Sequence, residues 1–466
     1  MKNFINALRN NDARTTNGMA THSTSLNKNL DLFFLAGASR KMSENDITAL
    51  FAAAYAENKE LALKTLFWAR DIRGGAGERR FFRIAMTYLA TLNDGVLDRN
   101  VQHISEYGRW DDLFTLDGTH LDGDVLNLIR KGLYEDRNGL LAKWLPRKGP
   151  FANKVRKHLE LTPRAYRKLL VELSDTVEQR MCARKFDLIA YPRVPSVAMN
   201  KYRKAFFRND ETRYTAYIAS VQKGEAKINA DAIFPHTLFQ AIQKDRPGKM
   251  KDAIVAQWNA LPNYMANSTE KILPVCDVSG SMTGLPMDVS VSLGIYISER
   301  NESVFKDAFM TFSATPKLQY LKGDLYQRVN QLLRADWGMN TNLEAVFNLV
   351  LNKAKAAKLP ASEMPTKLLI ISDMEFDVAC NYNQNALEMI EDHYKRAGYR
   401  RPGIVFWNVN GRTGNVPAKV NAKNVALVSG FSPAILKTVL NGGDTFTPLG
   451  ILKDTVMAER YARIRV

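Results

Sequence analysis

The pattern of apolar residues changes near residue 265 and divides the chain into two parts that must fold differently. Before this point, apolar side chains recur at helical spacing in successive short segments, as in Ile47, Phe51 and Ala54, and no alternating strand pattern intervenes. After residue 270, short β-branched runs alternate with amphipathic segments. A chain of 466 residues is also too long for one hydrophobic core, so we expect at least two domains.

The first part predicts an α-helical domain over residues 1–265. Ser43 can cap the helix that contains Ile47, and short turns separate the segments that follow. Helices are expected over 43–55, 61–68, 81–92, 97–106, 122–143, 163–174, 197–208, 211–222 and 250–260. Successive short helices of this kind are typical of a HEAT-like repeat array.

The second part predicts a doubly wound, mostly parallel sheet domain over residues 271–445, with a boundary at 262–271. Strands are expected at Ile272–Val278, Ala308–Phe312, Leu368–Ser372, Ile404–Val409 and Val425–Val428. Helices are expected over 286–300, 324–334, 343–358 and 384–397, with another from residue 432. Alternation of strands and helices favours parallel pairing. Residues 446–466 are expected to form a C-terminal helix that packs back on the body of the protein.

Oxygen-bearing side chains follow two of the predicted strands and precede one helix. Asp277, Ser279 and Ser281 come after the first strand, Thr341 precedes the helix from residue 343, and Asp373 ends a later strand. Loops at the carboxyl ends of parallel strands converge on one crevice, so these residues predict a site for Mg²⁺ or another divalent cation. A helix cap followed by a turn is the simpler interpretation of the first three residues.

The net charge of +17 is concentrated in one stretch of the chain. Residues 143–208 contain 17 Lys and Arg but only 5 Asp and Glu, a net charge of +12. Such a concentration indicates a polyanionic partner, and charge alone does not distinguish RNA from DNA.

Thirteen cations of this stretch are the candidate RNA-binding residues. At 100° per residue, Arg164, Arg167 and Lys168 share one arc of a helix that begins at Thr162-Pro163. Exposed aromatic side chains nearby could stack on bases, but Tyr166 and Phe206 fit the core of the domain better. The full set is Lys143, Arg147, Lys148, Lys154, Arg156, Lys157, Arg164, Arg167, Lys168, Lys201, Arg203, Lys204 and Arg208.

Several passages resemble known families. DIRGGAGERRFFR and YGRWDDLF resemble the TROVE module of the Ro autoantigen family of RNA-binding proteins, and D-x-S-x-S with Thr341 and Asp373 resembles the metal-ion-dependent adhesion site of von Willebrand factor A domains. KWLPR, YPRVPS, FWNVN and SGFSP are similar to a family from bacteria, phages and other viruses with the same two-domain layout. The resemblance implies that the helices close into a ring with the α/β domain, that RNA binds at this ring, and that Asp277, Ser279, Ser281, Thr341 and Asp373 are the metal ligands.

The sequence predicts neither an enzymatic activity nor a membrane-spanning segment. The six histidines are scattered without zinc-binding spacing, and Ser279 and Ser281 lie outside a G-x-S-x-G elbow. No apolar run of about 18 residues could span a membrane. Three widely separated cysteines favour a reducing compartment, so we expect a cytoplasmic protein.

Two functions remain open at this point. The first is a non-catalytic RNA-binding protein, a ribonucleoprotein component of the Ro type that takes structured RNA or single-stranded ends. The second is an adaptor without RNA, whose metal site captures an acidic residue of an ATPase or a virion protein. Neither the oligomeric state nor the identity of the RNA follows from the chain.

Overall fold

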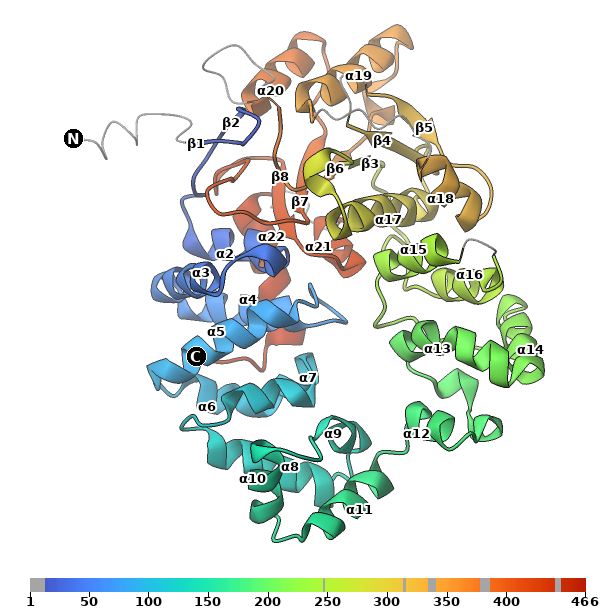
Figure 1. Cartoon of the computed structure of the whole chain (residues 1–466). Helices are drawn as coiled ribbons and strands as arrows, with labels where there is room; N and C mark the ends of the chain where they lie inside the picture. Colours follow the sequence, from blue (N-terminus) through green and yellow to red (C-terminus); the bar gives the residue numbers. More distant parts are fainter. Residues whose placement is uncertain (1–12, 246–247, 313–315, 334–340, 378–385, 441–445) are drawn as a thin grey trace.

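The structure is a computed structural model that describes residues 13–245, 248–312, 316–333, 341–377, 386–440 and 446–466. Helices make up nearly all of the regular structure up to residue 259, and a six-stranded sheet with its connecting helices follows (Figure 1). The predicted fold class, a helical domain followed by a doubly wound sheet domain, is confirmed.

Fifteen described helices form the first part, and several begin at a polar side chain that accepts a hydrogen bond from the first turn, among them Ser43, Asn58 and Thr162. Consecutive helices pack in pairs, so that each buries its apolar face on a neighbour. The helices are α2 (Lys28–Ala36), α3 (Glu44–Glu57), α4 (Lys59–Arg70), α5 (Arg79–Leu92), α6 (Val96–Asn100), α7 (Ile104–Tyr107), α8 (Asp122–Tyr134), α9 (Gly139–Trp144), α10 (Pro150–His158), α11 (Pro163–Leu173), α12 (Val177–Cys182), α13 (Ser196–Asn209), α14 (Glu211–Gln222), α15 (Pro235–Lys244) and α16 (Lys251–Asn259).

Two helix predictions were wrong in extent. The single helix expected over 122–143 is broken between α8 and α9, where Arg137 has a left-handed φ of 44° and Asn138 caps α9 by accepting from the Leu141 amide. The helix expected over 446–466 is α22 (Pro448–Val456), and a 3-10 turn at Glu459–Tyr461 follows it. Apolar periodicity continued across both breaks, so periodicity alone could not locate them.

The sheet has the strand order β5-β4-β3-β6-β7-β8. All neighbours pair in parallel except β4 and β5, which are antiparallel at the edge. All residues of the five parallel strands are buried, as expected when helices cover both faces. The strands are β3 (Ile272–Cys276), β4 (Ala308–Thr311), β5 (Leu318–Tyr320), β6 (Lys367–Ser372), β7 (Gly403–Asn408) and β8 (Val425–Ser429), and the main helices are α17 (Leu285–Arg300), α18 (Leu325–Leu333), α19 (Leu343–Ala356), α20 (Ala386–Arg396) and α21 (Leu436–Leu440).

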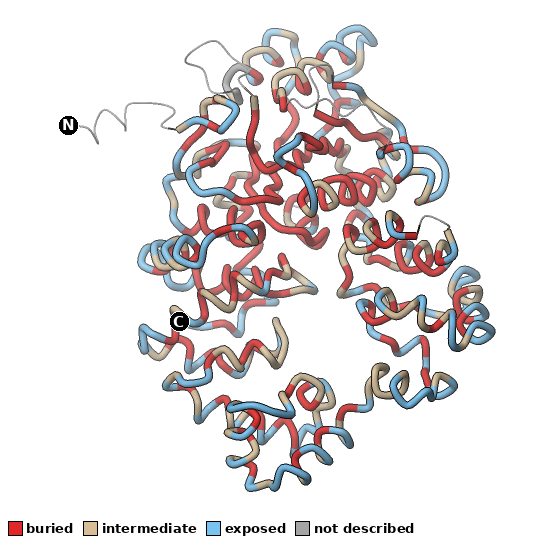
Figure 2. The backbone as a smooth tube through the Cα atoms, in the orientation of Figure 1, coloured by how far each residue is buried: buried red, intermediate tan, exposed pale blue. Residues whose placement is uncertain are grey.

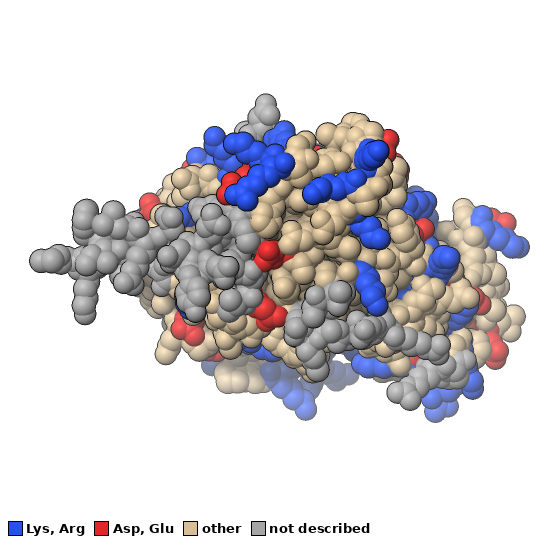
Figure 3. Space-filling view, turned by 90° about the horizontal axis from the view of Figure 1, so that it is seen from above, with Lys and Arg blue, Asp and Glu red and all other residues tan. Residues whose placement is uncertain are grey.

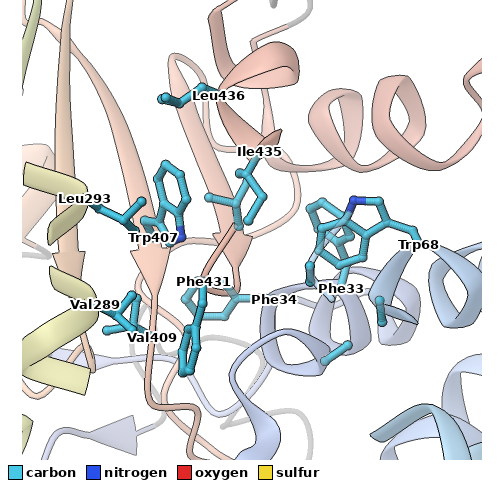
Figure 4. Close-up of a cluster of buried hydrophobic side chains, with 14 of the residues drawn as sticks. Phe33, Phe34, Trp68, Val289, Leu293, Trp407, Val409, Phe431, Ile435 and Leu436 are labelled. Atoms are coloured by element: carbon cyan, nitrogen blue, oxygen red, sulfur yellow. The ribbon is translucent and has the colours of Figure 1, made fainter. Parts of the chain in front are cut away.

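The helical series begins and ends against the sheet domain. At its start, α2 and α4 pack against β8 and α22, and Phe33, Trp68 and Trp407 belong to the shared apolar cluster (Figure 4). At its end, α15 packs on α17, where Gln240 donates to Asp288 over 2.8 Å. The helices are therefore arranged in a closed circuit through the α/β domain (Figure 1).

The C-terminal segment reinforces the first of these junctions. After α22, Arg460 and Tyr461 both contact the buried carboxylate of Asp71, which follows α4. Farther along, the amide of Arg465 donates to Asn100 over 3.0 Å. The end of the chain thus ties the sheet domain to helices α4 to α7, which are distant in sequence.

Gly37 lies where the backbone at the end of α2 closely approaches the backbone at the end of β8. A Cβ at this position would lie 2.4 Å from the carbonyl oxygen of Ser429. The Gly37→Ala variant must therefore move α2 away from β8, and we expect a loss of about 1–3 kcal/mol in the free energy of unfolding. Thermal and urea denaturation measure the loss. Gly123→Ala is the control, because a Cβ there meets nothing within 4 Å; an equal effect of both changes would contradict the packing argument.

A short hairpin, which the sequence did not predict, precedes the first helix. Its strands β1 (Ala13–Arg14) and β2 (Ala20–Thr21) pair antiparallel. The hairpin lies on the α/β domain, where Thr15 donates to the carbonyl of Phe376 over 2.7 Å and Gly18 forms a bridge with Asp377. The hairpin therefore packs on the sheet domain, beside the segment that follows β6.

The extent of burial differs between the sheet domain and the helical series (Figure 2). Buried residues dominate the parallel strands and helices α2 and α4, and helices α9 to α14 alternate buried, intermediate and exposed positions. A second, smaller core is formed by α13, α14 and α16 together with Ile189, Tyr191, Val194 and Ile228. Of the helices described, none has the length and apolar character needed to cross a bilayer.

Candidate metal centre and basic surface

The predicted metal site lies at the switch point of the sheet. Numbered within the sheet, the strand order is 3-2-1-4-5-6, so the connections from β3 and β6 leave toward opposite sides. Asp277 directly follows β3 and Asp373 directly follows β6, and these strands pair with Cys276 opposite Ile371. Ligands of doubly wound sheets bind in the crevice beyond the strand ends at this point.

The loop after β3 is held by the first carboxylate. The Ser279 amide donates to Asp277 Oδ1 over 2.9 Å, and the Ser372 hydroxyl donates to Asp277 Oδ2 over 2.5 Å. The hydroxyl oxygens of Ser279 and Ser281 lie 3.1 Å apart. Asp277 and Ser279 are buried and Ser281 is exposed, so this group of oxygens extends from the interior to the surface.

Thr341 approaches the same site from the start of α19, where it is fully buried. Its hydroxyl donates to the carbonyl of Glu375 over 2.7 Å, and its amide donates to Asp377 Oδ2, also over 2.7 Å. Glu375 is two residues beyond Asp373, and its amide contacts Asp373 Oδ1 at 3.3 Å. Residues 337–340, the rest of the predicted loop, lie outside the described residues.

The two aspartates are placed where negative charge is unfavourable. Burial, followed by the charge of Asp373, raises the pKa of Asp277 to about 6. Burial also raises the pKa of Asp373, and the Ser281 hydroxyl opposes part of that shift. Asp373 Oδ2 is buried and accepts no hydrogen bond from any described residue. A bound cation would relieve both the mutual repulsion and the unsatisfied oxygen.

The available donors suit a hard cation. They are carboxylate and hydroxyl oxygens, the ligands that Mg²⁺ takes together with water. Over the described part of the chain, no group of three or more His, Cys, Asp or Glu side chains could hold a metal ion. A site here therefore depends on hydroxyls beside two carboxylates. Arg412, which lies beside Asp373 and Glu375, was not predicted from the sequence, because it has no diagnostic spacing from Asp277.

Most of the basic segment lies far from the sheet. Helices α9 to α12 are at the end of the molecule opposite the sheet domain, and α13 lies at the side, beside α14 and α16 (Figure 1). The view from above shows the α/β face, where Lys and Arg occur in separate groups (Figure 3). Nine of the thirteen candidate cations are exposed and form no salt bridge with a described residue. They are Arg147, Lys148, Lys157, Arg164, Arg167, Lys168, Lys201, Lys204 and Arg208.

The exposed cations form two ridges. On α11, Arg164, Arg167 and Lys168 are exposed and the apolar face is buried through Tyr166 and Leu170. On α13, a second ridge at positions 201, 204 and 208 follows the helical spacing of one face. Because the aromatic face is in the core, these ridges present charge and not stacking surfaces.

The other four candidates are engaged within the protein and are not free for a ligand. Lys143 donates to Glu178 over 3.1 Å, and Lys154 contacts Asp117 and, at 2.6 Å, Asp122. Arg156 donates to the carbonyl of Leu161 over 2.9 Å, and Arg203 donates to the Asn200 side chain over 2.7 Å. The carboxylate partners of Lys154 lie 37 and 32 residues away and outside residues 143–208, so a count of charges within that stretch does not include them.

A third group of cations lies on α5 and directly before Trp110. Arg83 bridges Asp111 and Asp112 over 2.9 and 2.7 Å. The Arg109 guanidinium lies 3.9 Å from the ring centre of Trp144. Burial, followed by the charges of Arg109 and Arg83, lowers the pKa of Arg79.

The fold and the site together define a two-domain class: a closed circuit of helices, with a basic surface, joined to a doubly wound sheet with an oxygen-lined crevice. The family described as domain of unknown function DUF2828 matches residues 15–125 and 146–270, and that described as domain of unknown function DUF7788 matches residues 271–457. Uncharacterized protein L728 of Acanthamoeba polyphaga mimivirus is 31% identical over 498 residues, covering 94% of this chain and 86% of that protein. The chain therefore belongs to the DUF2828 family.

A solved structure also matches most of the chain. The Ro (RSR) protein of Deinococcus radiodurans is similar over 93% of this chain and 99% of its own, with 12% sequence identity and a TM-score of 0.39. The mimivirus relative confirms the predicted similarity to a family with viral members.

Proposed function

We propose that this protein binds RNA without catalysing a reaction, as a component of a ribonucleoprotein, and that its sheet domain holds Mg²⁺ or a similar cation. The observation that supports RNA binding is the set of nine exposed cations on and around α10, α11 and α13 that lack a described acidic partner. Cations paired with carboxylates contribute little to binding a polyanion, whereas unpaired ones neutralise phosphates and release counterions.

RNA is favoured over DNA by the sequence resemblance to the Ro autoantigen family, because the charges alone fit both polymers. The ridge residues offer phosphate contacts, so most of the affinity is expected to be independent of sequence and sensitive to salt. The half-buried Trp144, with the Arg109 guanidinium 3.9 Å from its ring centre, is proposed as a flat surface for an unpaired base at the start of the basic segment.

The metal site is proposed as a second binding face. Two buried carboxylates offset the charge of a divalent ion, and exposed Ser281 places one edge of the site at the surface. A cation there keeps the ability to bind an anionic group of a partner. This feature also suits the alternative role, in which the protein is a metal-dependent adaptor that recognises an acidic protein.

Purification at low ionic strength tests the proposal. We expect the protein to carry nucleic acid that raises its absorbance at 260 nm, that RNase removes and DNase does not, and that 1 M NaCl releases. Sequencing the released RNA identifies the ligand. An adaptor that does not bind RNA would instead copurify with a protein that EDTA releases; recovery of that protein with no nucleic acid would overturn RNA binding.

A further inference from the structure

Arg412 is the cation that lies beside the candidate metal ligands. Its guanidinium approaches Asp373 Oδ2 to 4.0 Å and Glu375 Oε1 to 3.6 Å. The Arg412 side chain is 46% exposed, whereas those of Asp373 and Glu375 are 0% and 5% exposed. A half-exposed positive group therefore lies beside two buried negative ones.

The two carboxylates differ in how far they are satisfied. Glu375 Oε2 accepts from the Thr16 amide over 2.6 Å, and Oε1 lies 3.4 Å from the Asn415 side-chain nitrogen. The N-terminal hairpin and the loop after β7 thus hold this carboxylate. Among the described residues, Asp373 Oδ2 has no such donor, and the guanidinium at 4.0 Å is too distant for a hydrogen bond. Arg412 balances the charge of Asp373 without satisfying its oxygen.

Hydrogen bonds hold the loop on both sides of Arg412, whereas the side chain of Arg412 is half exposed. The Gly411 amide donates to the carbonyl of Ala38 over 2.9 Å, and Asn415 donates to the carbonyl of Met374, also over 2.9 Å. These bonds anchor the loop on both sides of position 412. The guanidinium can therefore leave the carboxylates by rotation of its own side chain, with no change in the fold.

We propose that Arg412 is a built-in competitor of the divalent cation, which must displace the guanidinium from Asp373 in order to bind. This inference rests on the proposed metal site. A divalent ion bound at Asp373 would lie within a few ångströms of the guanidinium, and like charges at that separation repel strongly even near the surface. The displaced guanidinium then lies at the mouth of the crevice, where an anionic ligand on the metal would also meet it.

Titration of the full-length protein with Mg²⁺ by isothermal calorimetry tests the inference. Arg412→Gln should bind Mg²⁺ about tenfold more tightly than the natural chain, because one positive charge close to the ion is removed, and the difference should shrink in high salt. Arg412→Lys keeps the charge and should bind like the natural protein. Lys423→Gln, which neutralises an exposed cation of the same domain, should change nothing.

The outcomes separate this inference from the site on which it rests. If Mg²⁺ binds in a manner that requires Asp277 and Arg412→Gln binds with unchanged or weaker affinity, the competition is wrong and the metal site stands. If neither the natural protein nor Arg412→Gln binds Mg²⁺, both are wrong. If Arg412→Gln binds Mg²⁺ and the natural protein does not, the guanidinium excludes the ion completely, which supports the proposed competition. Melting curves in EDTA verify that each variant is folded.

Discussion

Reversing the charge of Arg164, Arg167 and Lys168 together should weaken the binding of single-stranded RNA by about 100-fold at low salt. The three side chains are exposed along one face of α11 and contact no described carboxylate, so each is free to neutralise a phosphate. The dependence of log K on log salt should also become shallower by about 2, because roughly 0.7 of a counterion is released per contact on a single strand.

The variant should remain folded. Arg164 lies in the first turn of α11, where a glutamate interacts favourably with the helix dipole, and the buried face through Tyr166 and Leu170 is untouched. The control reverses Lys306, Lys317 and Lys322, which are exposed on the sheet domain, and changes the net charge equally. Fluorescence anisotropy with a labelled oligonucleotide measures both variants. Equal losses would show that only the total charge matters and that the ridge is not the binding surface.

Asp277→Asn should abolish the stabilisation of the protein by Mg²⁺. When the ion is at about 100 times its dissociation constant, binding adds roughly 2.7 kcal/mol to the free energy of unfolding. The amide cannot offset the charge of the ion, so the rise in melting temperature on adding Mg²⁺ should disappear. Differential scanning calorimetry with Mg²⁺ and with EDTA measures the change.

The same variant should not be less stable than the natural protein in EDTA. Asp277 is fully buried beside Asp373, and its pKa of about 6 lies above the ordinary 3.8, so its ionised form opposes folding at neutral pH. An amide removes that charge and can keep the bond from the Ser279 amide. Asp136→Asn, at an exposed turn, is the control. A Mg²⁺ response that survives in Asp277→Asn would remove this site from consideration.

The sequence by itself determined the two-domain division and, to within two residues, the ends of the five parallel strands, but not the edge strand β5. Buried parallel strands such as β6 and β7 are continuous apolar runs, and their period and length are local properties of the chain. The positions of Asp277 and Asp373 followed, because parallel strands end at the same edge of a sheet. Likewise, the ridge on α11 follows from a helical spacing of 100° per residue.

Only the tertiary structure decided which charges are free and what surrounds the metal site. Lys154 appears unpaired in the local sequence, yet Asp117 and Asp122 neutralise it after the chain folds. Glu375 and Arg412 meet beside Asp373 because two loops and the N-terminal hairpin converge there. Electrostatic partners depend on distance in space, which a linear pattern does not contain, whereas burial of a strand or helix face is encoded in the periodicity of its own residues.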